Sequence, residues 1–374
     1  MDKQIQDPQE QKETENPSDN GAEKSRRVRN IPLLIVEVCA LFLAIGIMYI
    51  VVTATEEVER KTIDEDKITV NEEVVETLQA EERETTKKKG YYNIAFFGVD
   101  ARDGELGKGT RSDTIIIASI NQDTQEIKLI SVFRDTYLNL GNDSYNKCNA
   151  AYAQGGPEQA ISMLNANLDL NITDYVTVGF GGLIDSVDAL GGVEMEVTDA
   201  EISHLNNYQL TMSEELGVDY IPVEHSGRQL LNGMQATAYC RIRYTKGDDF
   251  RRAERQRDVL TAMMEKAKKA SVGSLTEMVN AILPEVETSL GVNEILGVLG
   301  SVAGYNVVAS DGFPFEDNRV GVNVGSKGSC VIPDDLEENV IELHEILYPE
   351  ADYKPSKRVT GISDEIEAKT AEYR

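Results

Sequence analysis

Residues 113–134 read DTIIIASINQDTQEIKLISVFR, and this stretch decides the fold class of the chain. The run 113–121 is apolar and rich in Ile, and the run 126–134 comes after it, separated by a turn-like Gln-Asp-Thr-Gln. Short apolar runs predict buried strands, and the tight connection predicts that the two runs pair as a hairpin. The run NIAFFGVD at 93–100, which ends in Asp, predicts another buried strand.

Helical and strand patterns alternate in the rest of the chain. Apolar spacing predicts helices at 155–170, 182–192 and 251–270, strands at 175–180 and 193–197, and a strand, a turn and a final helix over 328–349. The segment ATAYCRIRY at 236–244 fits a helix or a strand at its start. Strands mixed with helices predict an α/β sandwich.

The first 53 residues differ sharply in composition from the remainder of the chain. Residues 1–30 are polar and predict a disordered tail, because they have too little apolar surface to offset the entropy of ordering. Residues 31–53, IPLLIVEVCALFLAIGIMYIVVT, are long and apolar enough to span a membrane as one helix, with Glu37 near its start. Basic residues precede the span and acidic residues come after it, which places the N-terminus in the cytoplasm and the remainder outside.

Three further segments complete the predicted organisation. Residues 54–90 are strongly charged and predict a stalk or, equally, a solvated linker. Residues 91–350 form the one predicted globular domain, and residues 351–374 are polar and predict a flexible C-terminal tail.

Composition excludes several functional classes. The chain carries 65 Asp and Glu against 37 Lys and Arg, a net charge of −28, which argues against nucleic-acid binding because that function needs a basic surface. Four Cys are too few for a disulfide scaffold, and three His without a Cys-x-x-Cys pair make a zinc site improbable.

Arginine placement is the most informative polar feature. Arg102, Arg111 and Arg134 lie at or just beyond predicted strand ends. A second group crowds one short window: Arg241, Arg243, Arg251, Arg252, Arg255 and Arg257. Arginine is suited to bidentate recognition of anions such as phosphates. For Arg251 and Arg257 we favour ordinary pairing with nearby carboxylates; in a strand, Arg241 and Arg243 would share one face.

Two carboxylates accompany these arginines. Asp100 ends one predicted strand and Asp113 begins the next, so both can lie at one sheet edge. Such a pair fits Mg²⁺ with a phosphate ligand, whereas Asp113 could equally cap a turn in Arg-Ser-Asp-Thr.

An ordered set of motifs resembles one known family, LytR-CpsA-Psr. The matching segments are GVDAR (98–102), RSDT (111–114), SVFRDTYL (131–138), KCNAAYAQGGP (147–157), DALGGV (188–193), LNGMQATAYCRIRY…GDDFRRAERQR (231–257) and the end of the domain from FPFE onward. They occur in the family order over about residues 91–350. The resemblance implies a three-layer α-β-α sandwich around a mixed central sheet, preceded by one transmembrane helix.

The resemblance also implies a function. Members transfer a glycopolymer, such as a teichoic acid or a capsular polysaccharide, from polyprenyl pyrophosphate to peptidoglycan N-acetylmuramic acid as a phosphodiester. The implied protein is therefore a single-pass cell-membrane enzyme with an extracytoplasmic catalytic domain. Mg²⁺ is the implied cofactor, with Mn²⁺ as the alternative. Two other functions remain open: hydrolysis of the lipid pyrophosphate, and non-catalytic sensing of envelope precursors.

Carried over by position, Asp100 and Asp113 match the family's metal-linked carboxylates, and six arginines match its catalytic set: Arg102, Arg111, Arg134, Arg241, Arg243 and Arg252. Of these, Arg134, Arg241, Arg243 and Arg252 are the implied pyrophosphate ligands. Two residues depart from the family pattern. Phe133 replaces the Pro usual before Arg-Asp, and Arg251 replaces the Gly usual after Asp-Phe. The second change leaves open whether Arg251 or Arg252 faces the phosphates, and we favour Arg252.

Three further assignments stay open at the sequence level. Asp135 is either a general base or, as we favour, a partner of Arg134. The stretch 175–190 either lines a slot for the lipid or packs as ordinary core. Cys148 and Cys330 lie in loop-like stretches and are predicted to form a disulfide with Cys240 reduced and buried, the alternative being three free thiols.

Overall fold

The computed structural model describes residues 67–74, 90–99, 106–107, 109–243, 245, 248–271, 273, 275, 279, 282, 285–291, 295 and 302–374. No helix in these segments is long and apolar enough to cross a membrane. The predicted tail at 1–30 and the predicted span at 31–53 lie outside them, as does most of the predicted stalk.

The described strands are β1 (Tyr91–Val99), β2 (Ser112–Asn121), β3 (Glu126–Val132), β4 (Tyr137–Asn139), β5 (Tyr145–Lys147), β6 (Asp174–Val178), β7 (Val193–Val197), β8 (Gly227–Leu231), β9 (Val286–Thr288), β10 (Asn306–Phe313), β11 (Arg319–Asn323) and β12 (Ser329–Pro333). The described helices are α3 (Asn149–Leu168), α4 (Phe180–Ala189), α5 (Asp199–Leu216), α6 (Gly233–Cys240), α7 (Asp248–Ala267), α10 (Leu336–Leu347) and α11 (Lys357–Thr370). Short 3₁₀ turns cover Val302–Gly304, Glu316–Asn318 and Gly325–Lys327.

The central sheet has six strands in the order β10-β3-β2-β1-β6-β9. Strands β1, β2 and β3 are antiparallel neighbours in turn, which confirms the predicted hairpin. Strand β1 is parallel to β6, and β3 is parallel to β10, so the sheet is mixed as predicted.

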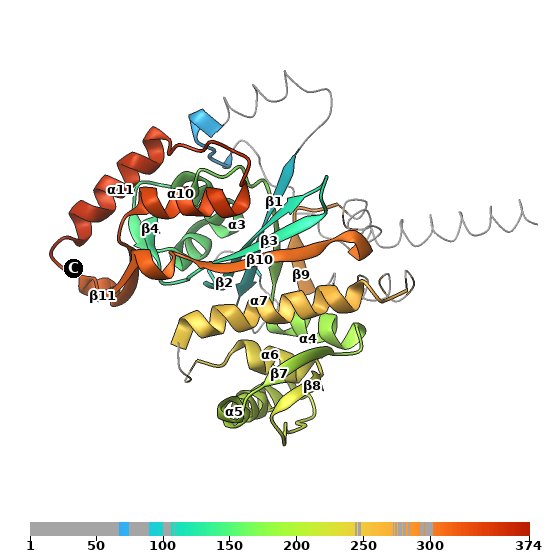
Figure 1. Cartoon of the computed structure of the whole chain (residues 1–374). Coiled ribbons are helices and arrows are strands. Elements are labelled where there is room, and N and C mark those ends of the chain that lie inside the picture. Colours follow the sequence, from blue (N-terminus) through green and yellow to red (C-terminus); the bar gives the residue numbers. More distant parts are fainter. Residues whose placement is uncertain are drawn as a thin grey trace, which may run out of the picture. The chain divides into compact units, whose positions relative to one another are not determined.

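Helices cover both faces of this sheet (Figure 1). Alternate residues of β1 and β2, such as Phe97 and Ile117, pack with α3, α10 and α11. The intervening residues, such as Ile94 and Ile116, face the other side and pack with Leu260 and Met264 of α7. The period of two along each strand therefore produces two apolar faces and three layers.

A smaller group of elements lies on the far side of α7 from the sheet (Figure 1). Strands β7 and β8 form a two-stranded antiparallel sheet that pairs Val193 with Leu231, and α4, α5 and α6 pack with it around an apolar core of their own. Segment 236–244, left open between helix and strand, belongs to α6 up to Cys240. Arg241 caps that helix in a helical conformation, so Arg241 and Arg243 do not alternate on a strand.

The C-terminal segment differs from its prediction as a flexible tail. Residues Lys357–Thr370 form α11, which begins at the N-cap Ser356, whose hydroxyl accepts a hydrogen bond from the Val359 amide. Val359, Ile362 and Ile366 recur at helical spacing and are buried in the main core. Only this narrow stripe is apolar, so the polar composition of the segment conceals an amphipathic helix.

The first described residues belong to the predicted stalk, yet they pack on the domain. The Asn71 side chain is buried and donates hydrogen bonds to the carbonyls of Asn165 and Ala166 and to the Asp169 carboxylate. Asp169 also accepts from the Ser356 amide and hydroxyl and from the Tyr353 hydroxyl. One buried carboxylate thus joins residues 67–74, the end of α3 and the start of α11.

Candidate active site

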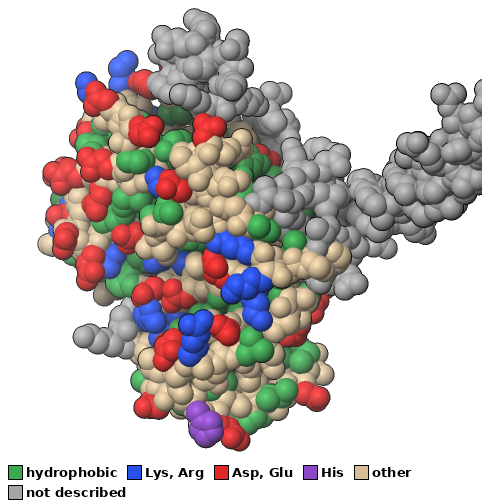
Figure 2. All heavy atoms as spheres, turned by 45° about the vertical axis from the view of Figure 1, so that its right-hand side comes forward, with side chains coloured by type: hydrophobic (Ala, Val, Ile, Leu, Met, Phe, Trp, Pro, Cys, Tyr) green, Lys and Arg blue, Asp and Glu red, His purple; other side chains and the backbone are tan. Residues whose placement is uncertain are grey.

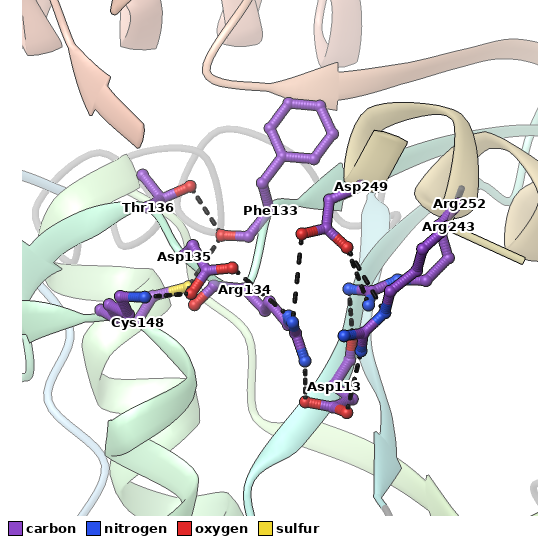
Figure 3. Close-up of polar contacts among 10 residues, drawn as sticks. Asp113, Phe133, Arg134, Asp135, Thr136, Cys148, Arg243, Asp249 and Arg252 are labelled. Atoms are coloured by element: carbon purple, nitrogen blue, oxygen red, sulfur yellow. Dashed lines mark hydrogen bonds and ion pairs between the residues drawn. The ribbon is translucent and has the colours of Figure 1, made fainter. Parts of the chain in front are cut away.

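The site is built where β2 begins and β3 ends, because antiparallel neighbours bring those two ends to the same sheet edge. Arg134 lies just beyond the end of β3, and its Nη1 donates to Asp113 Oδ1 of β2 at 2.7 Å. Burial lowers the pKa of Arg134, but the carboxylates of Asp113, Asp135 and Asp249 outweigh it and the net pKa is raised. Arg134 is therefore a fixed cation at this edge (Figure 3).

The first turns of α7 bring a second cation to the same place. Arg252 is only 5 % exposed, and its Nη1 lies 2.9 Å from Asp249 Oδ1. Its Nη2 donates to the Asp113 carbonyl at 3.4 Å. Burial, and after it repulsion from Arg134, lowers the pKa of Arg252 to about 10. It stays charged near neutral pH, and the negative charge of a bound anion would offset the repulsion from Arg134.

The segment after α6 supplies two more arginines. Arg243 Nη2 lies 3.6 Å from Asp113 Oδ2, and its Nε lies 3.6 Å from Asp249 Oδ1. Arg241 instead lies over aromatic rings, 4.5 Å from the Phe180 centroid and 5.4 Å from the Tyr208 centroid. The two side chains therefore have different surroundings although they are two residues apart.

These four residues, Arg134, Arg241, Arg243 and Arg252, form what we call the arginine cluster. Asp249 is part of its framework, since it lies within ion-pair distance of Arg134, Arg243 and Arg252 (Figure 3). Sequence reasoning missed Asp249, because Gly-Asp-Asp-Phe offers two adjacent carboxylates with no periodic signal to choose between them. On the face in Figure 2, Lys and Arg side chains gather in a band with carboxylates among them.

Several N–H groups of the cluster are not satisfied by the described residues. Nη1 of Arg241 and Nε of Arg252 are buried and make no hydrogen bond there. Leaving a buried donor unpaired costs about 1–3 kcal/mol, and more for a charged group. The cluster therefore has donor capacity that an anionic ligand with several acceptor oxygens would use.

A buried arginine to which sequence reasoning assigned no role of its own positions the Arg241–Arg243 segment. Arg255 is 1 % exposed, and its Nε donates to Glu201 of α5 at 2.8 Å. Its Nη1 donates to the Ile242 carbonyl at 3.1 Å, and its Nη2 donates to Thr245 Oγ1 at 2.7 Å. Arg255 thus fixes the backbone between Arg241 and Arg243 without joining the cluster.

The remaining predicted arginines divide clearly. Arg251 pairs with Glu254 at 2.6 Å, so Arg252 and not Arg251 faces the cluster, as we favoured. Arg257 donates to Ser310 Oγ and stays outside the cluster. Arg111 precedes β2 and is exposed. Asp100 and Arg102 lie outside the described residues.

A large apolar cavity of about 790 Å³ opens beside the cluster. Its walls come from the α7-facing side of the sheet, from α4 and from α7, with Phe96, Ile116, Leu183 and Met264 among them. Arg134, Arg241, Arg243 and Arg252 also line it. Seven residues of the stretch 175–190 take part, which favours a ligand-lining role over pure core packing: Val176, Val178, Gly179, Phe180, Leu183, Ser186 and Leu190.

Asp135 is held between two cations. Its Oδ1 lies 2.8 Å from Lys147 Nζ, and its Oδ2 lies 3.4 Å from Arg134 Nε. Both carboxylate oxygens are therefore engaged by cations that hold the side chain in place. The geometry therefore supports the role of a structural partner to Arg134.

The predicted disulfide is absent from the structure, in which Cys148, Cys240 and Cys330 are free and buried thiols. Cys148 Sγ donates to the Phe133 carbonyl at 3.1 Å, which gives this thiol a partner of its own. Burial raises the pKa of all three thiols, that of Cys240 to about 12, so none is activated.

The described residues contain no group of three or more His, Cys, Asp or Glu that could hold a metal ion. Asp113 is one carboxylate at the cluster, and Mg²⁺ characteristically takes one or two carboxylates together with phosphate oxygens and water. One carboxylate, that of Asp113, is therefore enough to bind Mg²⁺ when phosphate oxygens and water supply the other ligands.

Known proteins resemble this chain in sequence and fold. The LytR_cpsA_psr family model matches residues 47–327. The chain is 33 % identical over 236 residues to polyisoprenyl-teichoic acid--peptidoglycan teichoic acid transferase TagU of Oceanobacillus iheyensis, covering 60 % of this chain and 67 % of that protein. It covers 63 % of TagU of Enterococcus faecalis and 54 % of TagV of Bacillus subtilis, so it spans little more than half of some relatives.

Solved structures show the same fold. The crystal structure of Bacillus subtilis TagV superposes with a TM-score of 0.56 at 26 % identity, covering 72 % of this chain and 100 % of that one. A structure described as TagT bound to LI-WTA superposes with a TM-score of 0.57 at 21 % identity, covering 71 % and 94 %. The mixed-sheet α/β fold predicted from the sequence is thereby confirmed.

Proposed function

The chain belongs to the LytR_cpsA_psr family, as its motifs indicated, and from that membership we propose that it transfers a glycopolymer from polyprenyl pyrophosphate to peptidoglycan. The product is a phosphodiester to N-acetylmuramic acid. The names of the TagU and TagV relatives as teichoic acid transferases support this reaction class.

The observation that carries the proposal is the position of the arginine cluster at one side of the apolar cavity. A polyprenyl pyrophosphate has a long apolar chain joined directly to a strongly anionic group. The cavity of about 790 Å³ matches the chain, and Arg134, Arg243 and Arg252 beside it match the pyrophosphate. Few other ligand classes require an apolar cavity and several arginines in contact.

The cluster's contribution to the reaction can be derived from phosphoryl-transfer chemistry. The acceptor hydroxyl oxygen forms a bond to the glycan-side phosphorus, while the bond from that phosphorus to the polyprenyl phosphate oxygen breaks. The leaving polyprenyl phosphate keeps the electron pair, and the hydroxyl proton passes to solvent. Arg134 and Arg252 stabilise the charge that develops on the leaving phosphate, and Arg241 and Arg243 orient the pyrophosphate.

Mg²⁺ is part of the proposal: Asp113 would hold it, and the family match assigns Asp100 as the second carboxylate. When bound, the ion would neutralise part of the pyrophosphate charge. Asp113 also fixes Arg134 and Arg243, so it organises the cations whether or not metal is bound. We further propose that residues 31–53 anchor the chain in the cell membrane, with the catalytic domain on the extracytoplasmic side.

The test uses the full chain in detergent with Mg²⁺, a lipid-pyrophosphate-linked saccharide and peptidoglycan fragments, with products read by mass spectrometry. We expect a phosphodiester conjugate that is lost in Arg134→Ala and Arg252→Ala and is retained in Arg228→Ala, an exposed arginine paired with Glu194. Free saccharide phosphate in the presence of acceptor would favour hydrolysis. Tight lipid binding without any turnover would favour a sensor.

A further inference from the structure

A second, smaller hollow of about 200 Å³ adjoins the arginine cluster. It shares Asp113, Thr114, Arg134, Arg252 and Gln256 with the large cavity, so these residues form the wall between the two. The rest of its lining includes residues of β11 and β12, two strands that do not line the cavity. The hollow is smaller than the roughly 300–1,000 Å³ of drug-sized ligand pockets, and so suits one ring and not a polymer.

In-line displacement gives this hollow a position in the reaction. The attacking oxygen must approach phosphorus from the side opposite the leaving group. Under the proposed function, the leaving polyprenyl phosphate lies on the cavity side of Arg134 and Arg252. The attacking hydroxyl therefore comes from the other side of those arginines, where the hollow lies.

The hollow has an aromatic wall. Phe250 is 36 % exposed and lines it, and Phe133 meets Phe250 edge to face with ring centroids 4.7 Å apart. The Arg319 guanidinium lies 3.9 Å from the Phe250 centroid and braces the same ring. An exposed aromatic ring held on two sides beside a phosphate-binding cluster offers a flat apolar surface to a sugar ring.

A glycine in β10 provides the space that the Phe133 ring occupies. A Cβ at Gly312 of β10 would lie 2.3 Å from Phe133 Cζ, so only glycine accommodates the ring there. Phe133 occupies the position at which the family usually has proline. The aromatic wall is therefore a feature of this chain that the family resemblance did not imply.

The floor of the hollow holds an unused polar group. Ser131 lines it and is 3 % exposed, and its hydroxyl has no hydrogen-bond partner among the described residues. A buried hydroxyl without a partner carries a desolvation cost that a ligand hydroxyl could remove. Ser329 adds a second hydroxyl to the lining. A ring with one apolar face and several hydroxyls matches both the aromatic wall and these serines.

We propose that this hollow is the acceptor subsite, which holds one sugar ring of the peptidoglycan strand with its apolar face against Phe250. The inference rests on the proposed function, because it assigns the second substrate of the same reaction. It makes Phe250 a specificity-determining residue that acts on the acceptor and not on the lipid donor.

Two variants test the subsite in the full chain in detergent, with a soluble uncross-linked peptidoglycan fragment as the probe. Phe250→Ala removes the aromatic face, and we expect the acceptor KM to rise about tenfold, or ~1.4 kcal/mol, with little change in kcat. Gly321→Leu fills the hollow, because a Cβ at Gly321 meets nothing within 4 Å, and we expect acceptor binding to be lost. Binding of the lipid donor should be unchanged in both.

The matched controls are Tyr220→Ala, an aromatic of similar exposure that lies outside the hollow, and Gly361→Leu, on an open face of α11. Acceptor binding is also read by saturation-transfer NMR without donor, so it does not depend on turnover. Unchanged fragment binding in Gly321→Leu, or no binding to the unmodified chain, overturns the subsite. Failure of the lipid donor to bind overturns the proposed function instead, so the two failures are distinguishable.

Discussion

Arg255 has the clearest energetic role of any single residue near the site. Its guanidinium and the Glu201 carboxylate are 1 % and 3 % exposed, and their atoms lie 2.8 Å apart. Removing one partner of such a pair leaves a buried charge without compensation, which typically costs about 3–5 kcal/mol. We expect Arg255→Ala to lower the free energy of unfolding by that amount in urea titrations. Arg251→Ala, which breaks only a half-exposed pair with Glu254, is the control and should cost far less.

The same pair predicts a pH dependence. Burial raises the pKa of Glu201, but hydrogen bonds from Thr198 and Arg255 outweigh it, and the net pKa is lowered. A lowered folded-state pKa contributes stability above the unfolded pKa of about 4.3, and this stability is lost as the pH falls through the folded value. Glu201→Gln should therefore be less stable than the unmodified chain at pH 7, with the difference shrinking below pH 4. An equal difference at both pH values would contradict this.

The contact between Gly312 and Phe133 can be measured as a coupling. Gly312→Ala places a methyl group on the Phe133 ring, and overpacking of this kind costs about 1–3 kcal/mol. In a Phe133→Ala background the same change should be close to neutral. A double-mutant cycle from urea unfolding gives the coupling energy directly. Strictly additive effects would show that the ring has room to move.

At the scale of elements, α11 is part of the core. Ile362 is 2 % exposed and packs in the main cluster. Truncating a fully buried Ile to Ala costs about 2–5 kcal/mol, and we expect Ile362→Ala to lower the urea midpoint accordingly. Glu367→Ala changes an exposed position of the same helix and should have little effect. Equal urea midpoints for the two variants would show that α11 does not contribute to the core.

Strands β1, β2, β3 and β6 of the sheet, and the pairing of β2 with β3, could be predicted from sequence because their signal is local, whereas β9 and β10 were not predicted. Runs such as 113–121 carry their own apolar period and their own turn residues. The proximity of Arg134 and Asp113 could be inferred from strand ends, and the role of Arg252 from the family pattern. Each of these depends on short stretches of chain.

The rest of the site depends on tertiary packing that no local pattern carries. Arg241 and Arg243 looked like a strand pair, but α6 ends at Cys240 and Arg255 fixes the next residues from another helix. The role of Asp249 could not be predicted, because it depends on the packing of α7 against the end of β3. Cys148 and Cys330 are free thiols buried in the same core. Their spacing along the chain does not distinguish this arrangement from a disulfide.

At the scale of the whole molecule, the proposed function predicts that the cavity prefers lipids of a certain length. Each buried CH₂ contributes about 0.8 kcal/mol, so affinity should rise with polyprenyl chain length until the cavity of about 790 Å³ is filled. We expect displacement titrations with polyprenyl pyrophosphates of increasing length to reach a plateau. Leu183→Trp, which adds bulk to the α4 wall, should weaken the long lipids and spare the shortest one. Affinity that does not depend on length would mean that the chain binds elsewhere.

The junction at Asp169 has a mechanical consequence. Tension along the chain from the N-terminal side reaches residues 67–74 before it reaches β1. In that segment, Asn71 is hydrogen-bonded to the end of α3. Asp169, one of its partners there, also accepts a hydrogen bond from Ser356 at the start of α11. These hydrogen bonds would have to break before the tension reaches β1. Under the proposed membrane anchor at residues 31–53, this junction separates the anchor from the sheet that carries Arg134.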